Sequence, residues 1–177
     1  MKRILFIDRD GVILQEPPQD FQVDSTVKTS FVPGAIVGLS NIAASLDYYK
    51  VMVTNQDGLG TPSYPEDTFY PYQNLMLRTL EGEGFTFDEV IIDKTFAHEN
   101  APTRKPGTGL LTHLINNPAY DLSNSFVIGD RYTDIQLAKN LGCKAIYFKS
   151  DLHPLTPEQD QDLRGTIALE TNSWADI

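Results

Sequence analysis

The stretch Ile4-Leu5-Phe6-Ile7-Asp8-Arg9-Asp10-Gly11 places four apolar residues directly before two acids and a glycine. A continuous apolar run that is bounded by charge is typical of a strand buried on both faces, as the strands of a parallel sheet are. Several such runs along the chain predict a parallel sheet. They are Ile4–Ile7, Val51–Val53, Val90–Ile92, Ser125–Ile128 and Ala145–Phe148.

Stretches with helical spacing of apolar residues separate these runs. They are Ile36–Leu46, Tyr72–Leu80, Leu110–Ile115 and Ile135–Leu141. The alternation favours an α/β fold, a doubly wound, Rossmann-like parallel sheet with helices on both faces. Because proline favours helix starts and glycine helix ends, Pro33-Gly34 is expected to precede the first of these helices and Gly142 to end the last.

The length of 177 residues and the hydrophobic content of 41% fit one folded domain over residues 1–177. The segments Gln15–Phe31 and Gln56–Tyr70 are loop-like and too short to form a capping domain, so we expect an open site. The tail Thr171–Ile177 lacks a helix terminator. It is expected to be either a natural frayed end or the cut end of the N-terminal part of a longer chain.

The charge balance of the chain is acidic, with 24 Asp and Glu against 14 Lys and Arg and a net charge of −10. This composition argues against nucleic acid and anionic membranes as partners, because both need clustered Lys and Arg. A small substrate is expected instead. The apolar stretch at the N-terminus is too short for a signal peptide or a membrane helix, so a cytoplasmic protein is expected. Cys143 is the only cysteine and is interpreted as a buried small hydrophobe.

Polar side chains follow three of the predicted strands at the points where these end. Because ligands of open α/β sheets bind outside the carboxyl ends of the strands, these side chains are expected to converge on one site. Carboxylate and hydroxyl oxygens with few imidazoles indicate Mg²⁺ rather than zinc. The side chains are those of Asp8, Asp10, Thr54, Asn55, Asp130 and Asp134.

The spacing Asp8-x-Asp10 favours covalent catalysis of phosphoryl transfer. Side chains two apart on an extended segment point the same way, so Asp8 could attack phosphorus while Asp10 reaches the leaving oxygen as acid and later as base. Gly11 would allow a tight turn whose backbone N–H groups face the phosphoryl oxygens. The alternative interpretation is a capped turn at the end of a strand.

Further candidates for phosphate binding lie at the second strand end and in the second half of the chain. Thr54 and Asn55 offer a hydroxyl and an amide, although both residues also favour ordinary turns. Arg104 and Lys105 form a basic pair that could offset phosphate charge and keep the nucleophile ionised, the alternative being a solvated loop. Asp130 is assigned to the metal and Asp134 to a supporting position, where capping of a helix is its alternative role.

These blocks, in this order, resemble the haloacid dehalogenase-like hydrolase superfamily: D-x-D-G-[TV], Ser/Thr at a strand end, Lys, then G-D-x-x-x-D. The resemblance implies Asp8 as nucleophile and metal ligand and Asp10 as acid/base that ligates Mg²⁺ through its backbone carbonyl. It further implies that Thr54 and Lys105 bind the phosphoryl group and that Asp130 binds the metal.

A closer resemblance, to the histidinol-phosphate phosphatase domains of bifunctional chains, rests on Phe6–Gly11, Thr54–Gly60, Val127–Ile135 and Glu16-Pro17-Pro18. It implies dephosphorylation of histidinol phosphate in histidine biosynthesis by a phosphatase domain that a dehydratase domain follows. Many relatives carry a Cys/His zinc loop before Arg-Lys-Pro. The equivalent segment here, residues 95–103, has no cysteine and a single histidine, so no zinc is expected.

The ammonium and imidazole of histidinol phosphate call for carboxylates or amide oxygens near the phosphate site. Two other functions stay open, a sugar (heptose) bisphosphate or nucleic-acid-end phosphatase and a non-catalytic phosphate-binding domain. The acidic surface argues against nucleic-acid ends, and the intact Asp10 argues against the non-catalytic domain. The candidate substrate contacts, for which solvated loop residues are the alternative, are Glu16, Asp20, Gln22, Gln56 and Asp57.

Overall fold

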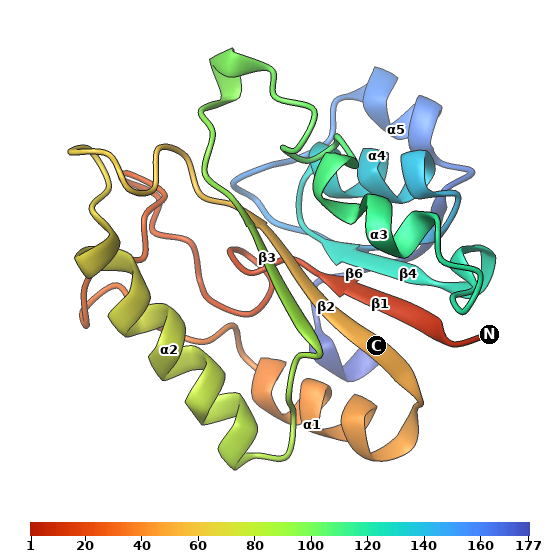
Figure 1. The fold of residues 1–177 in the computed structure, drawn as a ribbon, viewed down its shortest axis with the longest axis horizontal. Coiled ribbons are helices and arrows are strands. Elements are labelled where there is room, and N and C mark those ends of the chain that lie inside the picture. The colour runs from red at the N-terminus through yellow and green to blue at the C-terminus, as the bar shows by residue number, and fades with distance from the viewer.

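The computed structural model describes residues 1–177 and contains a six-stranded parallel sheet with the order β3-β2-β1-β4-β5-β6 (Figure 1). This order is that of one common doubly wound arrangement, so the predicted fold class is confirmed. The strands are β1 (Arg3–Ile7), β2 (Tyr48–Asn55), β3 (Glu89–Asp93), β4 (Phe126–Gly129), β5 (Lys144–Phe148) and β6 (Ile167–Thr171). The α-helices are α1 (Ala35–Ser45), α2 (Glu66–Gly82), α3 (Thr112–Ile115), α4 (Tyr132–Leu141) and α5 (Pro157–Leu163).

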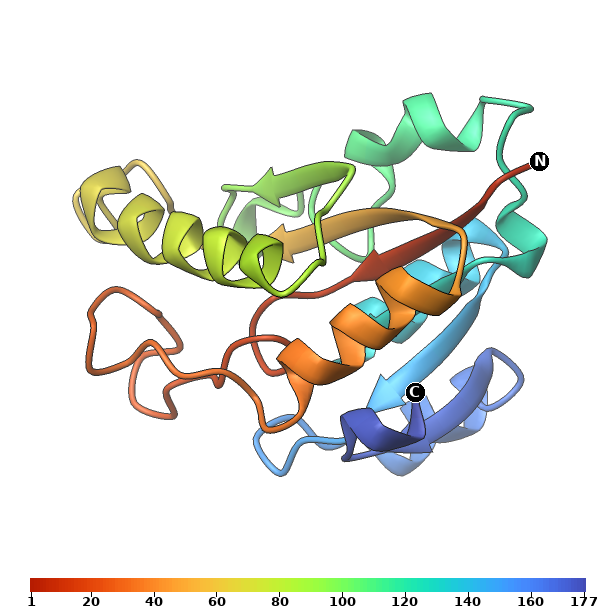
Figure 2. The ribbon, with the colours of Figure 1, turned by 90° about the horizontal axis from the view of Figure 1, so that it is seen from below.

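Helices cover both faces of the sheet, and each face has its own hydrophobic core (Figure 2). Successive side chains of β1 alternate between the two cores: Leu5 and Ile7 pack with α1 and α2, whereas Ile4 and Phe6 pack with α3 and α4. This alternation follows from the two-residue period of a strand and explains why β1 has a continuous apolar sequence.

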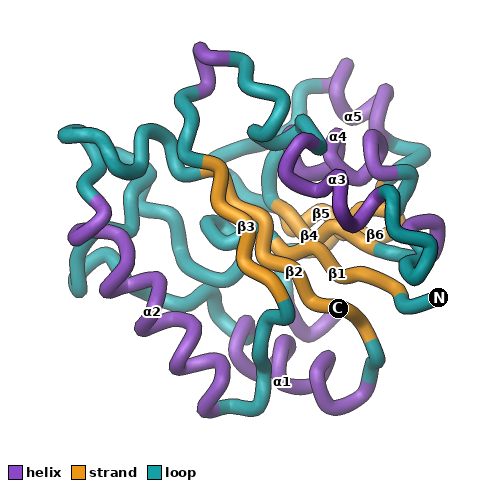
Figure 3. The backbone as a smooth tube through the Cα atoms, viewed as in Figure 1, coloured by secondary structure: helices purple, strands orange, loops and turns teal.

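The register of β1 places the functional segments at one edge of the sheet. Ile7 pairs with Met52 of β2 on one side and with Ile128 of β4 on the other. The residues that follow these three parallel strands therefore leave the sheet at the same edge. Loop segments gather there (Figure 3), and the connections after β1 and β4 diverge to opposite faces, as they do at the ligand-binding crevice of doubly wound folds.

Three elements differ from the sequence-based prediction. Helix α2 begins at Glu66, not near Tyr72, and continues through Pro71, so residues 66–70 of the expected loop Gln56–Tyr70 are helical although proline disfavours a helix interior. Strand β6 and helix α5 were not predicted. The expected helix boundaries at Gly34 and Gly142 are confirmed, and both glycines adopt left-handed backbone conformations.

The C-terminal segment packs against α1. Trp174 is buried in the core on the α1 side of the sheet, and its indole N–H donates to the carbonyl of Val12 at 2.9 Å. Cys143 is buried as well, in the core on the opposite face. None of the helices has both the length and the apolar character that crossing a bilayer requires.

Candidate active site

A cavity of about 270 Å³ opens at the carboxyl ends of the central strands. The structure brings Asp8, Asp10, Thr54 and Lys105 together on its wall, although Lys105 comes from the loop after β3. All five loop residues expected near a substrate line the cavity too. The lining residues are Asp8, Asp10, Glu16, Asp20, Phe21, Gln22, Thr54, Asn55, Gln56, Asp57, Tyr64, Arg104, Lys105, Arg131 and Thr133.

Asp8 lies directly after β1 and is almost fully buried. Its Oδ1 accepts a hydrogen bond from the backbone N–H of Arg9 at 2.7 Å and lies 2.8 Å from the ammonium of Lys105. Burial and, to a smaller extent, the charge of Asp134 raise the pKa of Asp8 to about 7, although Lys105 partly opposes both. Because Oδ1 takes both contacts, Oδ2 is left for a ligand or a bond to substrate.

Asp130 follows β4, has no exposed surface, and neither of its carboxylate oxygens has a hydrogen-bond partner. Burial, together with the charges of Asp8 and Asp134, raises the pKa of Asp130 to about 9. Ligand atoms of these three carboxylates all lie within 4.8 Å of one another. Buried carboxylates without partners are costly unless they are neutralised, so this group fits a hard cation.

The glycine after Asp10 makes room for Asp130. Gly11 has a φ of +78°, and a Cβ at this position would lie 2.2 Å from Oδ2 of Asp130. The N–H of Gly11 donates to the carbonyl of Leu14 at 2.8 Å. The N–H of Gly11 is therefore already used within the turn, and the close approach to Asp130 is what requires glycine at this position.

Asp10 is held by two donors that the sequence-based analysis did not place there. A guanidinium nitrogen of Arg9 lies 2.7 Å from Oδ1, and the amide of Gln56 donates to Oδ2 at 2.7 Å. The same amide donates to the hydroxyl oxygen of Thr54 at 2.8 Å, which leaves the hydroxyl proton free to donate elsewhere. Arg9 is fully buried against the ring of Phe69, 4.9 Å from its centroid.

Lys105 bridges two carboxylates. Its ammonium lies 2.7 Å from Asp134 and 2.8 Å from Asp8. Burial alone would lower the pKa of Lys105, but the two carboxylates outweigh it, so the pKa is raised and the ammonium stays charged. Asp134 also accepts from the backbone N–H of Arg131 at the start of α4, which is the helix-capping contact given above as its alternative role.

The other two candidates for phosphate binding contact protein groups instead. Asn55 and Lys105 form a reciprocal pair, in which the amide of Asn55 donates to the Lys105 carbonyl at 3.2 Å and accepts from its N–H at 3.0 Å. Arg104 donates to Asp57 at 2.6 Å and to the carbonyl of Thr95 at 2.9 Å. Both side chains line the cavity, and these contacts fix the loop that carries Lys105.

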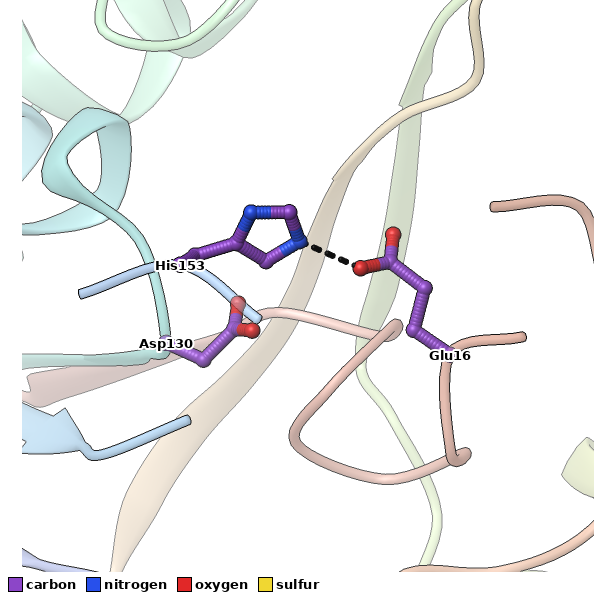
Figure 4. A group of neighbouring side chains, drawn as sticks. All are labelled: Glu16, Asp130 and His153. Carbon is purple, nitrogen blue, oxygen red and sulfur yellow. Dashed lines mark hydrogen bonds and ion pairs between the residues drawn. The ribbon is translucent and has the colours of Figure 1, made fainter. Parts of the chain in front are cut away.

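Glu16 is buried beside the cavity and contacts the guanidinium of Arg131 and the imidazole of His153, which come from distant parts of the chain. Figure 4 shows the contact with His153. One oxygen pairs with Arg131, and the other lies 2.5 Å from Nε2 of His153. His153 was not singled out from the sequence, because 137 residues separate it from Glu16.

The order of the strands and the carboxylates at their ends are typical of haloacid dehalogenase-like hydrolases, and a comparison with protein-family models points to the same family. The model of HAD-hydrolase-like proteins matches residues 102–171. The chain belongs to the haloacid dehalogenase-like hydrolases, as the resemblance of the four motif blocks predicts.

Among curated proteins, the chain is 53% identical to the histidine biosynthesis bifunctional protein HisB of Bacteroides fragilis over 173 residues, which cover 98% of this chain and 46% of that protein. It is 50% identical to HisB of Spirosoma linguale over 184 residues, which cover 100% of this chain and 48% of that protein. The chain thus spans about half the length of the curated relatives it matches.

Among solved structures, the fold is similar to D,D-heptose 1,7-bisphosphate phosphatase from B. bronchiseptica complexed with magnesium and phosphate. The TM-score is 0.72, the sequence identity is 23%, and the match covers 93% of this chain and 99% of that one. At this level of identity, the similarity concerns the fold alone.

Proposed function

We propose that this chain is a Mg²⁺-dependent phosphatase that hydrolyses histidinol phosphate through an aspartyl phosphate on Asp8. The observation that carries the proposal is the pair of unpartnered oxygens of Asp130. One of them lies within 4.8 Å of carboxylate oxygens of Asp8 and Asp134, beside a cavity that Lys105 and Thr54 line. This donor set suits a divalent cation and a phosphoryl group bound side by side.

The first step transfers the phosphoryl group to Asp8. An oxygen of Asp8 forms a bond to phosphorus while the bond to the ester oxygen breaks. The Thr54 hydroxyl and the Lys105 ammonium bind the equatorial oxygens, on which negative charge is concentrated. Lys105 also favours the ionised form of Asp8, because its ammonium lies 2.8 Å from the attacking carboxylate.

Asp10 moves the protons. It donates a proton to the leaving alkoxide and then takes one from the water that attacks the aspartyl phosphate, which releases phosphate and restores Asp8. Gln56 and Arg9 fix the direction of its carboxylate through two contacts of 2.7 Å. They act as positioning residues for this step.

Asp8, Asp130 and the backbone carbonyl of Asp10 would hold the metal. Mg²⁺ would offset the charge of the transferring phosphoryl group and of the buried carboxylates. The segment before Arg104 has no cysteine, and its single histidine, His98, stacks on Phe96 with the ring centroids 5.4 Å apart. This segment therefore lacks the ligands that a tetrahedral zinc site needs, and the proposed cofactor is Mg²⁺ alone.

Histidinol phosphate is proposed as the substrate on the strength of the HisB relatives. Its ammonium and imidazole would meet the cavity wall formed by Asp20, Gln22 and Asp57, which offers carboxylate and amide oxygens. We further propose that residues 1–177 form a single phosphatase domain, which in a longer chain precedes a dehydratase domain, and that the protein works in the cytoplasm.

A phosphate-release assay tests this function. Histidinol phosphate, heptose bisphosphate and a nucleotide monophosphate are compared as substrates after EDTA treatment and after Mg²⁺ is added back. We expect turnover only with Mg²⁺ and the highest kcat/KM for histidinol phosphate. A higher kcat/KM for heptose bisphosphate would show that histidinol phosphate is not the preferred substrate. The absence of turnover on all three compounds would favour a phosphate-binding domain.

A further inference from the structure

Three segments that are distant in sequence meet at Glu16, which together with Arg131 and His153 we term the Glu16 cluster. Figure 4 draws Glu16 and His153 of this cluster. Glu16 belongs to the loop after β1, Arg131 follows β4, and His153 follows β5. Glu16 is only 8% exposed, yet it pairs with both neighbours. Buried carboxylates persist where each oxygen has a partner, so this contact fixes the three segments relative to one another.

The cluster is a hydrogen-bonded contact and not a second cation site. His153, Glu16 and Asp130 offer ligand atoms within 4.8 Å of one another. However, the guanidinium of Arg131 pairs with Glu16 and lies 3.9 Å from Asp130, so its positive charge already offsets the negative charge of these two carboxylates. The imidazole contact at 2.5 Å is also too short for a metal to sit between the nitrogen and the oxygen.

Glu16 begins the segment that supplies one wall of the cavity, residues 15–31. Asp20, Phe21 and Gln22 from this segment line the cavity. Phe21 adopts a φ of +60°, an unfavourable conformation for a bulky residue, and the residue is 49% exposed. The centroid of the His153 imidazole lies 5.6 Å from that of the Phe21 ring, so His153 contacts both Glu16 and Phe21 of this segment.

We propose that His153 is a positioning residue for substrate binding, which acts together with Arg131 by fixing the wall segment 15–31 over the cavity through Glu16 and Phe21. The proposal rests on the proposed phosphatase function, and it concerns recognition of the alcohol part of the ester and not the transfer of the phosphoryl group. The chain has no cap domain, so this wall takes over the selection of substrate. Both oxygens of Glu16 already have partners, so Glu16 fixes the position of this wall segment and does not bind the substrate ammonium, the role that the sequence led us to expect for it.

The test compares three variants of the full chain. His153→Ala removes both contacts, whereas His153→Gln keeps an amide N–H in place of Nε2 and can still donate to Glu16. His113→Ala is the matched control, because His113 also pairs with a glutamate, Glu89, at 2.9 Å but lies on α3, outside the cavity.

For His153→Ala we expect the KM for histidinol phosphate to rise about tenfold, as the loss of one charged hydrogen bond predicts, with a much smaller change in kcat. His153→Gln should restore most of the KM. Amide hydrogen exchange of residues 15–31 should become faster in His153→Ala and stay as in the wild type in His113→Ala. Wild-type KM and wild-type exchange in His153→Ala would overturn the proposal.

Two measurements separate this proposal from the proposed function. If the wild type hydrolyses no phosphate ester, the proposed function fails, and the exchange of residues 15–31 still reports on the contact. If the wild type is active and His153→Ala lowers kcat as strongly for para-nitrophenyl phosphate as for histidinol phosphate, His153 serves phosphoryl transfer and not the wall, which contradicts the proposal.

Discussion

Two buried acidic groups lie next to each other at the carboxyl ends of the central strands, and they differ in how their charge is balanced. The strand-end cluster, Asp8, Asp130 and Asp134, contains three carboxylates and receives one ammonium, from Lys105. The Glu16 cluster contains one carboxylate, which an arginine and a histidine both contact.

This difference indicates which group performs chemistry. A carboxylate with complete partners contributes a fixed contact between segments, as a buried ion pair does when its geometry is good. A group with unpartnered oxygens and raised pKa values keeps a place for an external cation and for a reacting oxygen. Substitutions that exploit the difference should therefore affect turnover at the strand-end cluster and local structure at the Glu16 cluster.

The largest effect is expected for Asp8→Asn, which removes the nucleophile of the strand-end cluster. We expect kcat to fall more than about 10³-fold, because an amide cannot form the acyl phosphate. Asp93→Asn is the control. Asp93 is also buried at the carboxyl end of a strand, but Thr95 contacts its carboxylate at 2.5 and 3.0 Å, so turnover should stay at the wild-type level. Turnover by Asp8→Asn within tenfold of the wild type would exclude the covalent mechanism.

The next effect concerns the single cation of the strand-end cluster. Lys105→Met should lower the free energy of unfolding of the metal-free protein by about 3 kcal/mol, since it leaves two buried carboxylates without their partner. Lys94→Met removes an ion pair of equal length, 2.7 Å, between exposed side chains and should cost at most about 0.5 kcal/mol. Urea unfolding curves measure both. Equal losses would show that burial of Lys105 does not decide its contribution.

The strand-end cluster also predicts a dependence of stability on pH and Mg²⁺. The pKa values of Asp8, about 7, and Asp130, about 9, exceed the ordinary value of 3.8, so the folded protein binds more protons than the unfolded chain. The metal-free protein should therefore lose stability as the pH rises from about 4 to 9, by up to about 1.4 kcal/mol per pH unit for each proton. Mg²⁺ binds the ionised form, so its stabilising effect should grow with pH.

Thermal unfolding at several pH values, with EDTA or with Mg²⁺, checks this prediction. Asp130→Asn should flatten the pH dependence of the metal-free protein and weaken the effect of Mg²⁺ on Tm. The Glu16 cluster offers no comparable gain from Mg²⁺, so Glu16→Gln should keep the Mg²⁺-dependent rise of Tm. A wild-type Tm that Mg²⁺ leaves unchanged at pH 8 would contradict the assignment of a cation to the strand-end cluster.

The sequence predicted the strands from β3 to β5 and missed the edge formed by β6 for physical reasons. β1, β2, β4 and β5 are covered on both faces, so each contains a continuous apolar run. β6 is an edge strand, and its residues alternate between partly buried and exposed positions. α5 buries only Leu163 and has a polar sequence. The capping box from Thr156 to Gln159, with Pro157 at the first turn, is the local signal that could have revealed this helix.

For the site, residues that directly follow strands were predictable, whereas their partners were not. Asp8, Thr54 and Asp130 occupy positions that the parallel register brings together. Arg9 and His153 reach the site through side-chain packing, which has no local sequence period. Arg9 stands between two acids, where it was treated as the variable position of the motif, yet it is fully buried beside Asp10.

The smallest effect is expected for Asn55→Ala. Its effect on the free energy of unfolding decides whether Asn55 positions Lys105 or only contacts phosphate. If Asn55 positions Lys105 through its two backbone hydrogen bonds, Asn55→Ala should lower the free energy of unfolding of the ligand-free protein by about 1–2 kcal/mol. A role limited to phosphate contact would cost no stability in the absence of ligand. Asn140→Ala is the control, because Asn140 gives the same loop one bond, from an exposed position, to the carbonyl of Pro106. Urea unfolding that ranks Asn140→Ala above Asn55→Ala would contradict the positioning role and would return Asn55 to the phosphate contacts expected from the sequence.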